Sequence, residues 1–155
     1  MVKLETWQHN DFLEHEFVRD PLIDGDILDG GEKMVVVGES ESGKSYIVIQ
    51  LALELATEGS WFGFDILRRC RVSIFQSELS VSRYQQRYEK LAANYLGDKD
   101  IDIQITTVED LKLDTNEGVD VFQDYVFTYG PDVVIFDPTR AFFAGDENNS
   151  QSVEK

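Results

Sequence analysis

The feature that most constrains this chain is the segment of residues 38–45, which reads GESESGKS and fits the pattern G-x-x-x-x-G-K-[ST] at every fixed position. Glycine lets the backbone curl so that successive N–H groups point inward, and a helix that begins here adds the partial positive charge of its N-terminus. Such a loop binds phosphate groups. In this pattern Lys44 reaches the phosphate oxygens, and the hydroxyl of Ser45 is offered to a bound Mg²⁺ ion.

The segments on either side of this loop have the order that such a site requires. Residues 33–37 (KMVVV) are apolar and mostly β-branched, which predicts a strand, and a helix is predicted over about residues 46–58. Gly59 is then expected to end this helix in the left-handed conformation. Glu39 and Glu41 place two acids within the loop, and we expect their side chains to point outward. A polar turn between a strand and a helix is the alternative interpretation.

Two carboxylates follow strands farther along the chain. Residues 71–76 and 132–137 are rich in β-branched and aromatic side chains, which predicts buried strands, and residues 101–106 predict a third. Glu78 comes just after the first of these strands, and Asp137 ends the last. Ligands of doubly wound folds bind at the carboxyl ends of parallel strands, so both side chains are expected beside the loop. Glu78 is a candidate base and Asp137 a candidate magnesium ligand, with a simple strand cap as the alternative for Asp137.

Two helices are predicted between these strands. The first covers about residues 81–96 with Ser80 as its cap, and the second runs from about residue 114 to the stop at Gly130. Helical spacing predicts buried faces at Tyr84, Tyr88, Leu91 and Tyr95 in the first helix, and at Val121, Phe122, Tyr125, Val126 and Tyr129 in the second. Another face of the first helix carries Arg83, Arg87 and Lys90, which we interpret as a solvated flank or a partner contact.

The composition indicates one acidic domain with a substantial core. Of 155 residues, 42% are hydrophobic, and a chain of this length buries about 70% of its unfolded surface. A single cysteine, Cys70, excludes an internal disulfide, and no membrane-spanning run or signal peptide is evident, so we expect a cytoplasmic protein without a membrane partner. The net charge of −16 argues against a broad nucleic-acid surface. Basic residues gather between positions 68 and 90, which suits subunits that meet basic face to acidic face.

The N-terminal residues lack a regular pattern. Apolar side chains in residues 1–29 follow no clean period, and Pro21 interrupts any long helix, so we interpret these residues as an irregular lead-in to a core over residues 30–155. The two histidines of the lead-in have no candidate metal ligands nearby. Residues 61–64 (WFGF) predict an aromatic loop that covers a sheet edge or contacts a nucleotide base or a partner.

These motifs together resemble those of the RecA-like hexameric ATPases, most closely the plasmid RepA-type replicative helicases and related AAA-family ATPases. The similarity runs from about Pro21 onward and is carried by the segments PLIDGDILDGGEKMVVVGESESGKS, SIFQSELSVSRYQQR and DVVIFDPTRAFFAGDEN. It implies an α/β fold with a RecA-like P-loop NTPase core, in which a mostly parallel sheet is flanked by helices. Members of that family continue past the Walker B strand into further core strands, so the resemblance implies a chain truncated after that strand.

The resemblance also implies roles for individual residues. The phosphates would be bound by Gly38, Ser40, Ser42, Gly43 and Lys44. Ser45 and Asp137 would organise Mg²⁺, and Glu78 would polarise the attacking water. Arg87 and the segment Asp146-Glu147-Asn148 match family positions to which we assign no role.

The implied function is Mg²⁺-dependent binding and hydrolysis of ATP, with Lys44 and Glu78 as catalytic residues. The family resemblance implies a ring-forming helicase or motor of DNA replication or recombination, which is a homo-oligomer, hexameric in its full-length form, with single-stranded DNA as a candidate partner. One alternative is a nucleotide-gated assembly or binding module with little hydrolysis. Another is a P-loop kinase for a small molecule, which would need an arginine-bearing lid that we do not find after Asp137.

Overall fold

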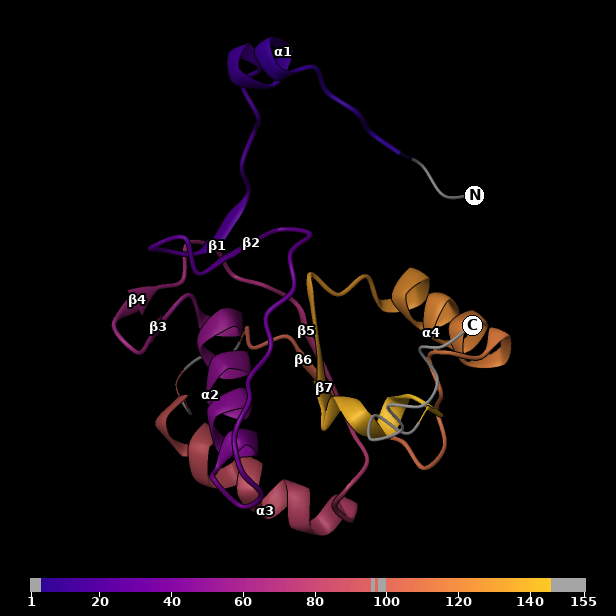
Figure 1. Cartoon of the computed structure of the whole chain (residues 1–155). Helices are drawn as coiled ribbons and strands as arrows, with labels where there is room; N and C mark the ends of the chain where they lie inside the picture. The colour runs from indigo at the N-terminus through magenta and orange to yellow at the C-terminus, as the bar shows by residue number, and fades with distance from the viewer. Residues whose placement is uncertain (1–3, 96, 98–99, 146–155) are drawn as a thin grey trace.

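The centre of the molecule is a parallel sheet of three strands, seen in Figure 1. The computed structural model describes residues 4–95, 97 and 100–145. Strand β5 (Val72–Gln76) lies between β6 (Ile103–Thr107) and β7 (Val133–Asp137). In register, Val72 pairs with Ile103 and Val133, and Gln76 pairs with Thr107 and Asp137. The carboxyl ends of all three strands therefore meet at one edge of the sheet.

Helices cover both faces of this sheet because each parallel connection must cross over one face. Helix α2 (Lys44–Thr57) and helix α3 (Val81–Ala92, extended by a 3₁₀ turn at Ala93–Tyr95) lie on one side, and α4 (Asn116–Tyr129) lies on the other (Figure 1). The two faces of β5 follow the alternation of a strand. Ile74 belongs to the core beneath α2, whereas the ring of Phe75 contacts Phe122 and Tyr125 of α4. An α/β core with a parallel sheet flanked by helices is confirmed.

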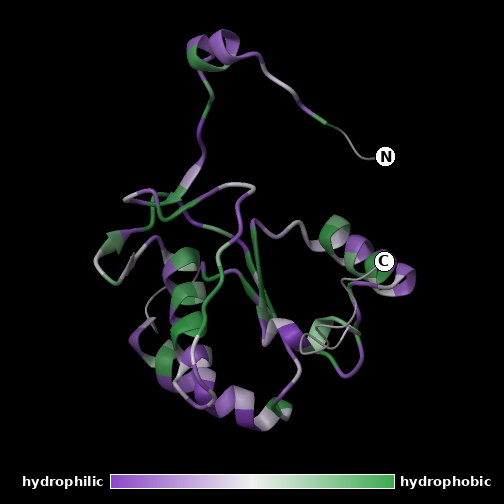
Figure 2. Cartoon of the chain, viewed as in Figure 1, coloured by the Kyte–Doolittle hydropathy of each residue, from purple (hydrophilic) through white to green (hydrophobic). Residues whose placement is uncertain are grey.

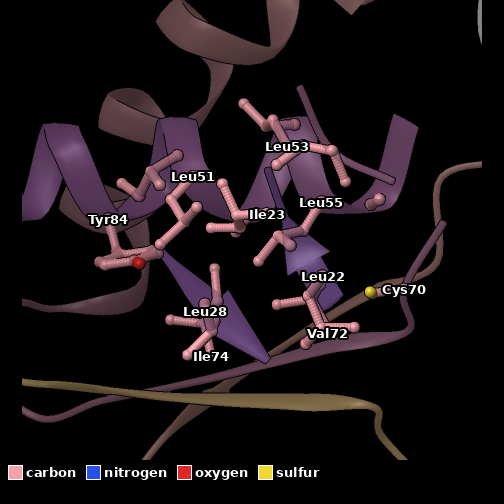
Figure 3. Close-up of a cluster of buried hydrophobic side chains, with 14 residues drawn as sticks. Leu22, Ile23, Leu28, Leu51, Leu53, Leu55, Cys70, Val72, Ile74 and Tyr84 are labelled. Atoms are coloured by element: carbon pink, nitrogen blue, oxygen red, sulfur yellow. The ribbon is translucent and has the colours of Figure 1, made fainter. Parts of the chain in front are cut away.

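The main hydrophobic core lies between α2 and the sheet. Figure 3 shows Leu51, Leu53 and Leu55 of α2 directed toward the side chains of the neighbouring strands. Figure 2 shows the same contrast in colour, because α2 and the strands are largely apolar while α3 is mostly polar. Leu53 and Ile74 are completely buried. Cys70 is a free, buried thiol at the edge of this core.

Short elements before the loop pack against this core. Helix α1 (His9–Glu14) stands away from the sheet in Figure 1, and strands β1 (Pro21–Ile23) and β2 (Leu28–Asp29) form an antiparallel pair. The guanidinium of Arg19 contacts the carboxylates of Asp26 and Asp29 at 2.6 and 2.7 Å, which closes this pair. Leu22, Ile23 and Leu28 lie in the core beneath α2. The division of the chain between residues 29 and 30 stays a prediction.

The aromatic loop at residues 61–64 is a small hairpin rather than a loop without structure. Strands β3 (Ser60–Trp61) and β4 (Phe64–Asp65) pair antiparallel, with Phe62 and Gly63 at the turn. The indole of Trp61 packs against the core, whereas Phe62 is 67% exposed. The hairpin therefore covers the end of the core with one ring and exposes the next.

The predicted strand at residues 33–37 is wrong. These residues have no regular secondary structure, and Val35 and Val37 are 76% and 86% exposed. A β-branched run forms a strand only where a neighbouring edge offers hydrogen bonds. No described strand pairs with this segment, although β6 and β7 each have one edge without a described partner. Met34 is nevertheless packed against the core, which fixes the approach to the loop.

Several predicted boundaries and faces also differ. Helix α2 ends one residue before the left-handed position, which is taken by Glu58 at φ +57° and not by Gly59. Helix α3 stops at Ala92, where a 3₁₀ turn replaces the α-helical geometry, and Leu96 is outside the described residues. The hydroxyl of Ser80 makes no capping bond to α3.

The buried stripe of α4 is narrower than its spacing predicts. Val121 is 55% exposed and Tyr129 is 49% exposed, whereas Phe122, Tyr125 and Val126 are half-buried. The reason for Val121 is an open cavity of about 760 Å³ between α4 and β6, which this side chain lines. Strand β7 is half-buried along its length, because it pairs on one edge only among the described strands.

Candidate functional site

The two glycines of the loop before α2, Gly38 and Gly43, differ in their surroundings. Gly43 precedes the helix at φ +89°, a left-handed conformation that only glycine adopts without strain, and a Cβ there would have open space. Gly38 has an ordinary φ, but a Cβ on it would come within 2.9 Å of the Ser42 hydroxyl. The loop therefore favours glycine for conformation at Gly43, whereas a side chain at Gly38 would require the Ser42 hydroxyl to move. Ser40 and Ser42 lie on its exposed side.

The backbone amides at the start of α2 form an anion nest. No described residue accepts a hydrogen bond from the amides of Gly43, Lys44 or Ser45. These three consecutive donors belong to the first turn of a helix, where N–H groups have no partner within the helix. Together with the helix dipole, they provide the kind of site that binds a phosphate group.

The ammonium of Lys44 folds back over the loop. Its Nζ donates to the carbonyl oxygens of Gly38 at 2.8 Å and Glu39 at 2.6 Å. These bonds tie the cation to the backbone of the loop. The loop is thus closed on itself by the same side chain that the sequence pattern assigns to phosphate.

Asp137 reaches the loop from the end of β7. The side chain of Ser45 lies close enough to its carboxylate to stabilise the ionised form. Burial raises the pKa of Asp137, and the negative charge of Glu78 raises it further, while Ser45 and the charges of Arg87 and Lys44 act in the opposite direction. The structure therefore brings Lys44, Ser45, Glu78 and Asp137 together at one end of the sheet.

The oxygens of Ser45 and Asp137 suit a hard divalent cation. Among the described residues, no group of three or more His, Cys, Asp or Glu side chains could hold a metal ion by itself. Mg²⁺ usually binds through one or two protein oxygens and completes its shell with water and phosphate oxygens. One hydroxyl and one carboxylate beside a phosphate nest fit that requirement.

Glu78 is positioned by a side chain that sequence analysis overlooked. Gln76, at the end of β5, is 1% exposed and holds the turn that follows. Its amide donates to the Leu79 carbonyl at 2.9 Å and to Thr107 Oγ1 at 2.7 Å, and its oxygen accepts from the Leu79 amide at 3.1 Å. A polar residue within an otherwise apolar strand was the available signal. Gln76 therefore fixes the direction in which the chain presents Glu78.

Arg140 is a second residue that the sequence did not single out. Its Nη2 lies 2.8 Å from Glu78 Oε1, and the two side chains are 74% and 50% exposed. Arg140 belongs to a 3₁₀ turn, Thr139–Phe142, which the buried ring of Phe142 anchors against Phe136. The pair forms because β5 and β7 are neighbours, so the only sequence signal was an arginine three residues after Asp137.

Two residues of α3 complete the surroundings of Asp137. The guanidinium of Arg87 stacks over the ring of Tyr46 at 5.0 Å from its centroid. Tyr84 is 3% exposed, and its hydroxyl has no hydrogen-bond partner among the described residues. Burial and the nearby charge of Asp137 raise the pKa of Tyr84, so its hydroxyl stays a proton donor beside that carboxylate. Sequence analysis assigned Tyr84 to the apolar face only.

The fold and this site define a P-loop nucleotide-binding protein of the ATPase type. A family model described as an AAA domain matches residues 1–155. The chain therefore belongs to this AAA-domain family. No curated protein and no solved structure gives a significant match to the chain.

The family match supports only part of the expected identity. It supports an ATPase of the P-loop AAA and RecA-like group, but it does not support the RepA-type subgroup. Within the described part of the chain, no helix has the length and apolar character needed to cross a bilayer. The segment of residues 146–148, which matches family positions without an assigned role, lies outside the described part of the chain.

Proposed function

We propose that this chain binds ATP with Mg²⁺ and hydrolyses it, and that it serves as a ring-forming motor of the RepA type in DNA replication or recombination. The observation that carries the proposal is the meeting of Lys44, Ser45, Glu78 and Asp137 around one nest of free amides. Phosphoryl transfer depends on positioning and charge stabilisation, and these are the groups that supply both.

The loop side of the site binds the phosphate chain. The amides of Gly43, Lys44 and Ser45 receive phosphate oxygens, and the Lys44 ammonium exchanges its two carbonyl partners for the β- and γ-phosphate oxygens. Ser45 and Asp137 are the protein ligands available to Mg²⁺. The ion, when bound, neutralises charge that develops on the phosphate oxygens. Asp137 must be ionised for this role, which its two neighbouring cations favour.

Glu78 faces the same site from the next strand and orients the attacking water. Its carboxylate is half-exposed and held by Arg140 at 2.8 Å. An exposed pair of this kind contributes about 0.2–1 kcal/mol, so Glu78 can leave it without a large barrier. Glu78→Gln is expected to retain ATP binding and to lower turnover by about 100-fold or more. Phosphate release, together with calorimetric ATP binding, is the measurement, and a variant that hydrolyses normally contradicts the assigned role.

The motor and the oligomer require a second measurement. Single-stranded DNA is expected to stimulate phosphate release, and light scattering is expected to show assembly when ATP is added. The basic residues of α3 and the overall charge of −16 support contact between unlike faces of neighbouring copies. Absence of both responses in a protein that binds ATP would reject the motor.

A nucleotide-gated assembly module with little hydrolysis is the second candidate. The observation in its favour is that Arg140 forms an ion pair with the carboxylate of Glu78, the group that hydrolysis requires. This candidate predicts ATP-dependent assembly with negligible phosphate release, and it makes Glu78→Gln equivalent to the parent protein. A small-molecule kinase would instead form ADP only when an acceptor is added.

A further inference from the structure

A cavity of about 210 Å³ lies between the start of α2 and the polar face of α3. We call it the α3 pocket, and it is lined by Tyr46, Leu79, Arg83, Gln86, Arg87 and Lys90. Two of these residues directly follow residues of the site, since Tyr46 comes after Ser45 and Leu79 comes after Glu78. The pocket therefore adjoins two segments of the chain that also supply residues to the site.

The pocket concentrates positive charge that no ion pair within the described part of the chain neutralises. Arg83, Arg87 and Lys90 lie at helical spacing on one face of α3, and none forms an ion pair with a described residue. Arginines elsewhere in the chain behave differently, since Arg19, Arg68 and Arg140 each contact an acidic side chain. Like charges on one helix face repel each other, and in a chain of net charge −16 acidic partners are abundant. A bound anion would remove this repulsion.

One of these cations is held in place before any ligand arrives. Arg87 is half-buried and stacks on the Tyr46 ring at 5.0 Å, which limits the freedom of its side chain. Its charge already acts on Asp137, so it lies between the pocket and the site. Gln86 adds an amide group that can donate to an oxygen ligand. One cation held by stacking, two exposed cations and an amide donor are groups that a small oxyanion can bind.

We propose that the α3 pocket binds a single free phosphate anion. Its cations converge on one small cavity, whereas a nucleic-acid backbone needs a groove that contacts several successive phosphates. The acidic surface elsewhere also opposes a long polyanion. If the proposed ATP hydrolysis holds, the phosphate released beside Glu78 is the natural source of this anion, and the pocket then retains product next to the site. That last step rests on the proposed function, and the binding itself does not.

The test uses the full chain with Lys44→Ala, which removes the ammonium of the loop. Inorganic phosphate is titrated into this protein by calorimetry at low ionic strength, and one binding site is expected. Adding Arg83→Gln and Lys90→Gln is expected to weaken phosphate affinity by at least about tenfold, because two of three charges are lost. Lys33→Gln removes an exposed lysine away from α3 and is the matched control. It should leave the affinity unchanged.

Three outcomes would overturn the proposal. In the first, the Lys44→Ala protein does not bind phosphate. In the second, the α3 variants and the Lys33→Gln control lose the same amount of phosphate affinity. In the third, a single-stranded oligonucleotide displaces phosphate, and its binding depends on Arg83 and Lys90. Circular dichroism checks folding, and Arg83→Gln alone serves if the combined variant unfolds. Failure here is distinguishable from failure of the ATPase, because ATP binding and turnover are measured on the parent protein with Lys44 present.

Discussion

The ion pair between Glu78 and Arg140 provides the sharpest test of how this site works. Breaking it with Arg140→Gln frees the carboxylate that we assign to the attacking water. The Nη2–Oε1 distance is 2.8 Å, but the side chains are 74% and 50% exposed, so the pair contributes about 0.2–1 kcal/mol. If Glu78 must leave Arg140 before each turnover, removing the partner lowers the barrier by that amount at most. The rate of phosphate release should then rise by about 1.4- to 5-fold.

The assay is steady-state phosphate release at saturating ATP and Mg²⁺, at low and at high salt. Salt screens an exposed pair, so the parent protein should approach the rate of the variant as ionic strength rises. Arg71→Gln is the matched control, because Arg71 contacts Asp132 at 3.7 Å at the opposite end of the same two strands. The gain should also vanish when Glu78→Gln is present.

A fall in rate by more than about tenfold in Arg140→Gln would refute this reasoning. Such a loss would mean that Arg140 stabilises charge in the transition state and that its contact with Glu78 is part of the working site. No change in rate, with salt dependence retained, would show that the pair does not limit turnover.

Three further predictions follow from single residues. Lys44→Ala should weaken ATP binding by at least about 100-fold in calorimetry, because the ammonium is the only side-chain cation folded over the loop among the described residues; unchanged affinity would remove the loop from the site. Burial raises the pKa of Asp137, so the folded state binds more protons than the unfolded state above pH 3.8, and this group makes stability fall as pH rises through that window. Asp137→Asn should abolish that slope and increase the unfolding free energy at pH 7 in urea titrations, and a less stable variant would contradict the sign. Leu53→Ala, at a fully buried position of α2, should cost about 2–5 kcal/mol of unfolding free energy, and a loss below 1 kcal/mol would mean that the core is not packed as described.

The sequence predicts what depends on neighbours along the chain. The loop geometry follows from two glycines and a helix start, and the order of β5, β6 and β7 with intervening helices follows from apolar runs and their spacing. The placement of Glu78 and Asp137 at one edge needs only the rule that parallel strands point the same way. These are local patterns combined with one topological rule, and the structure agrees with both.

The sequence fails where a residue depends on a partner far along the chain. The run at residues 33–37 has the composition of a strand but forms no ladder with any described strand. Val121 has the spacing of a core residue but faces an open cavity. The contact of Arg140 with Glu78 spans 62 positions and exists only because Gln76 and Asp137 are paired in register. Spacing along one helix or strand carries no information about such contacts.

The electrostatics of the site reconcile an acidic protein with an anionic substrate. A net charge of −16 opposes the long-range approach of a nucleotide, but fields inside a cleft depend on the nearest groups. Lys44 and Arg87 both act on Asp137, and Arg83 and Lys90 line the adjacent α3 pocket without acidic partners among the described residues. Arg68 and Arg71, at the amino end of the strands, are instead neutralised by Asp20 and Asp132. At the end of the sheet where phosphate chemistry is proposed, Arg83, Arg87 and Lys90 thus form no ion pair with a described residue, although Arg140 pairs with Glu78 there. Arg68 and Arg71 at the other end are both paired, so the distribution of charge, and not its sum, favours an anion at the proposed site.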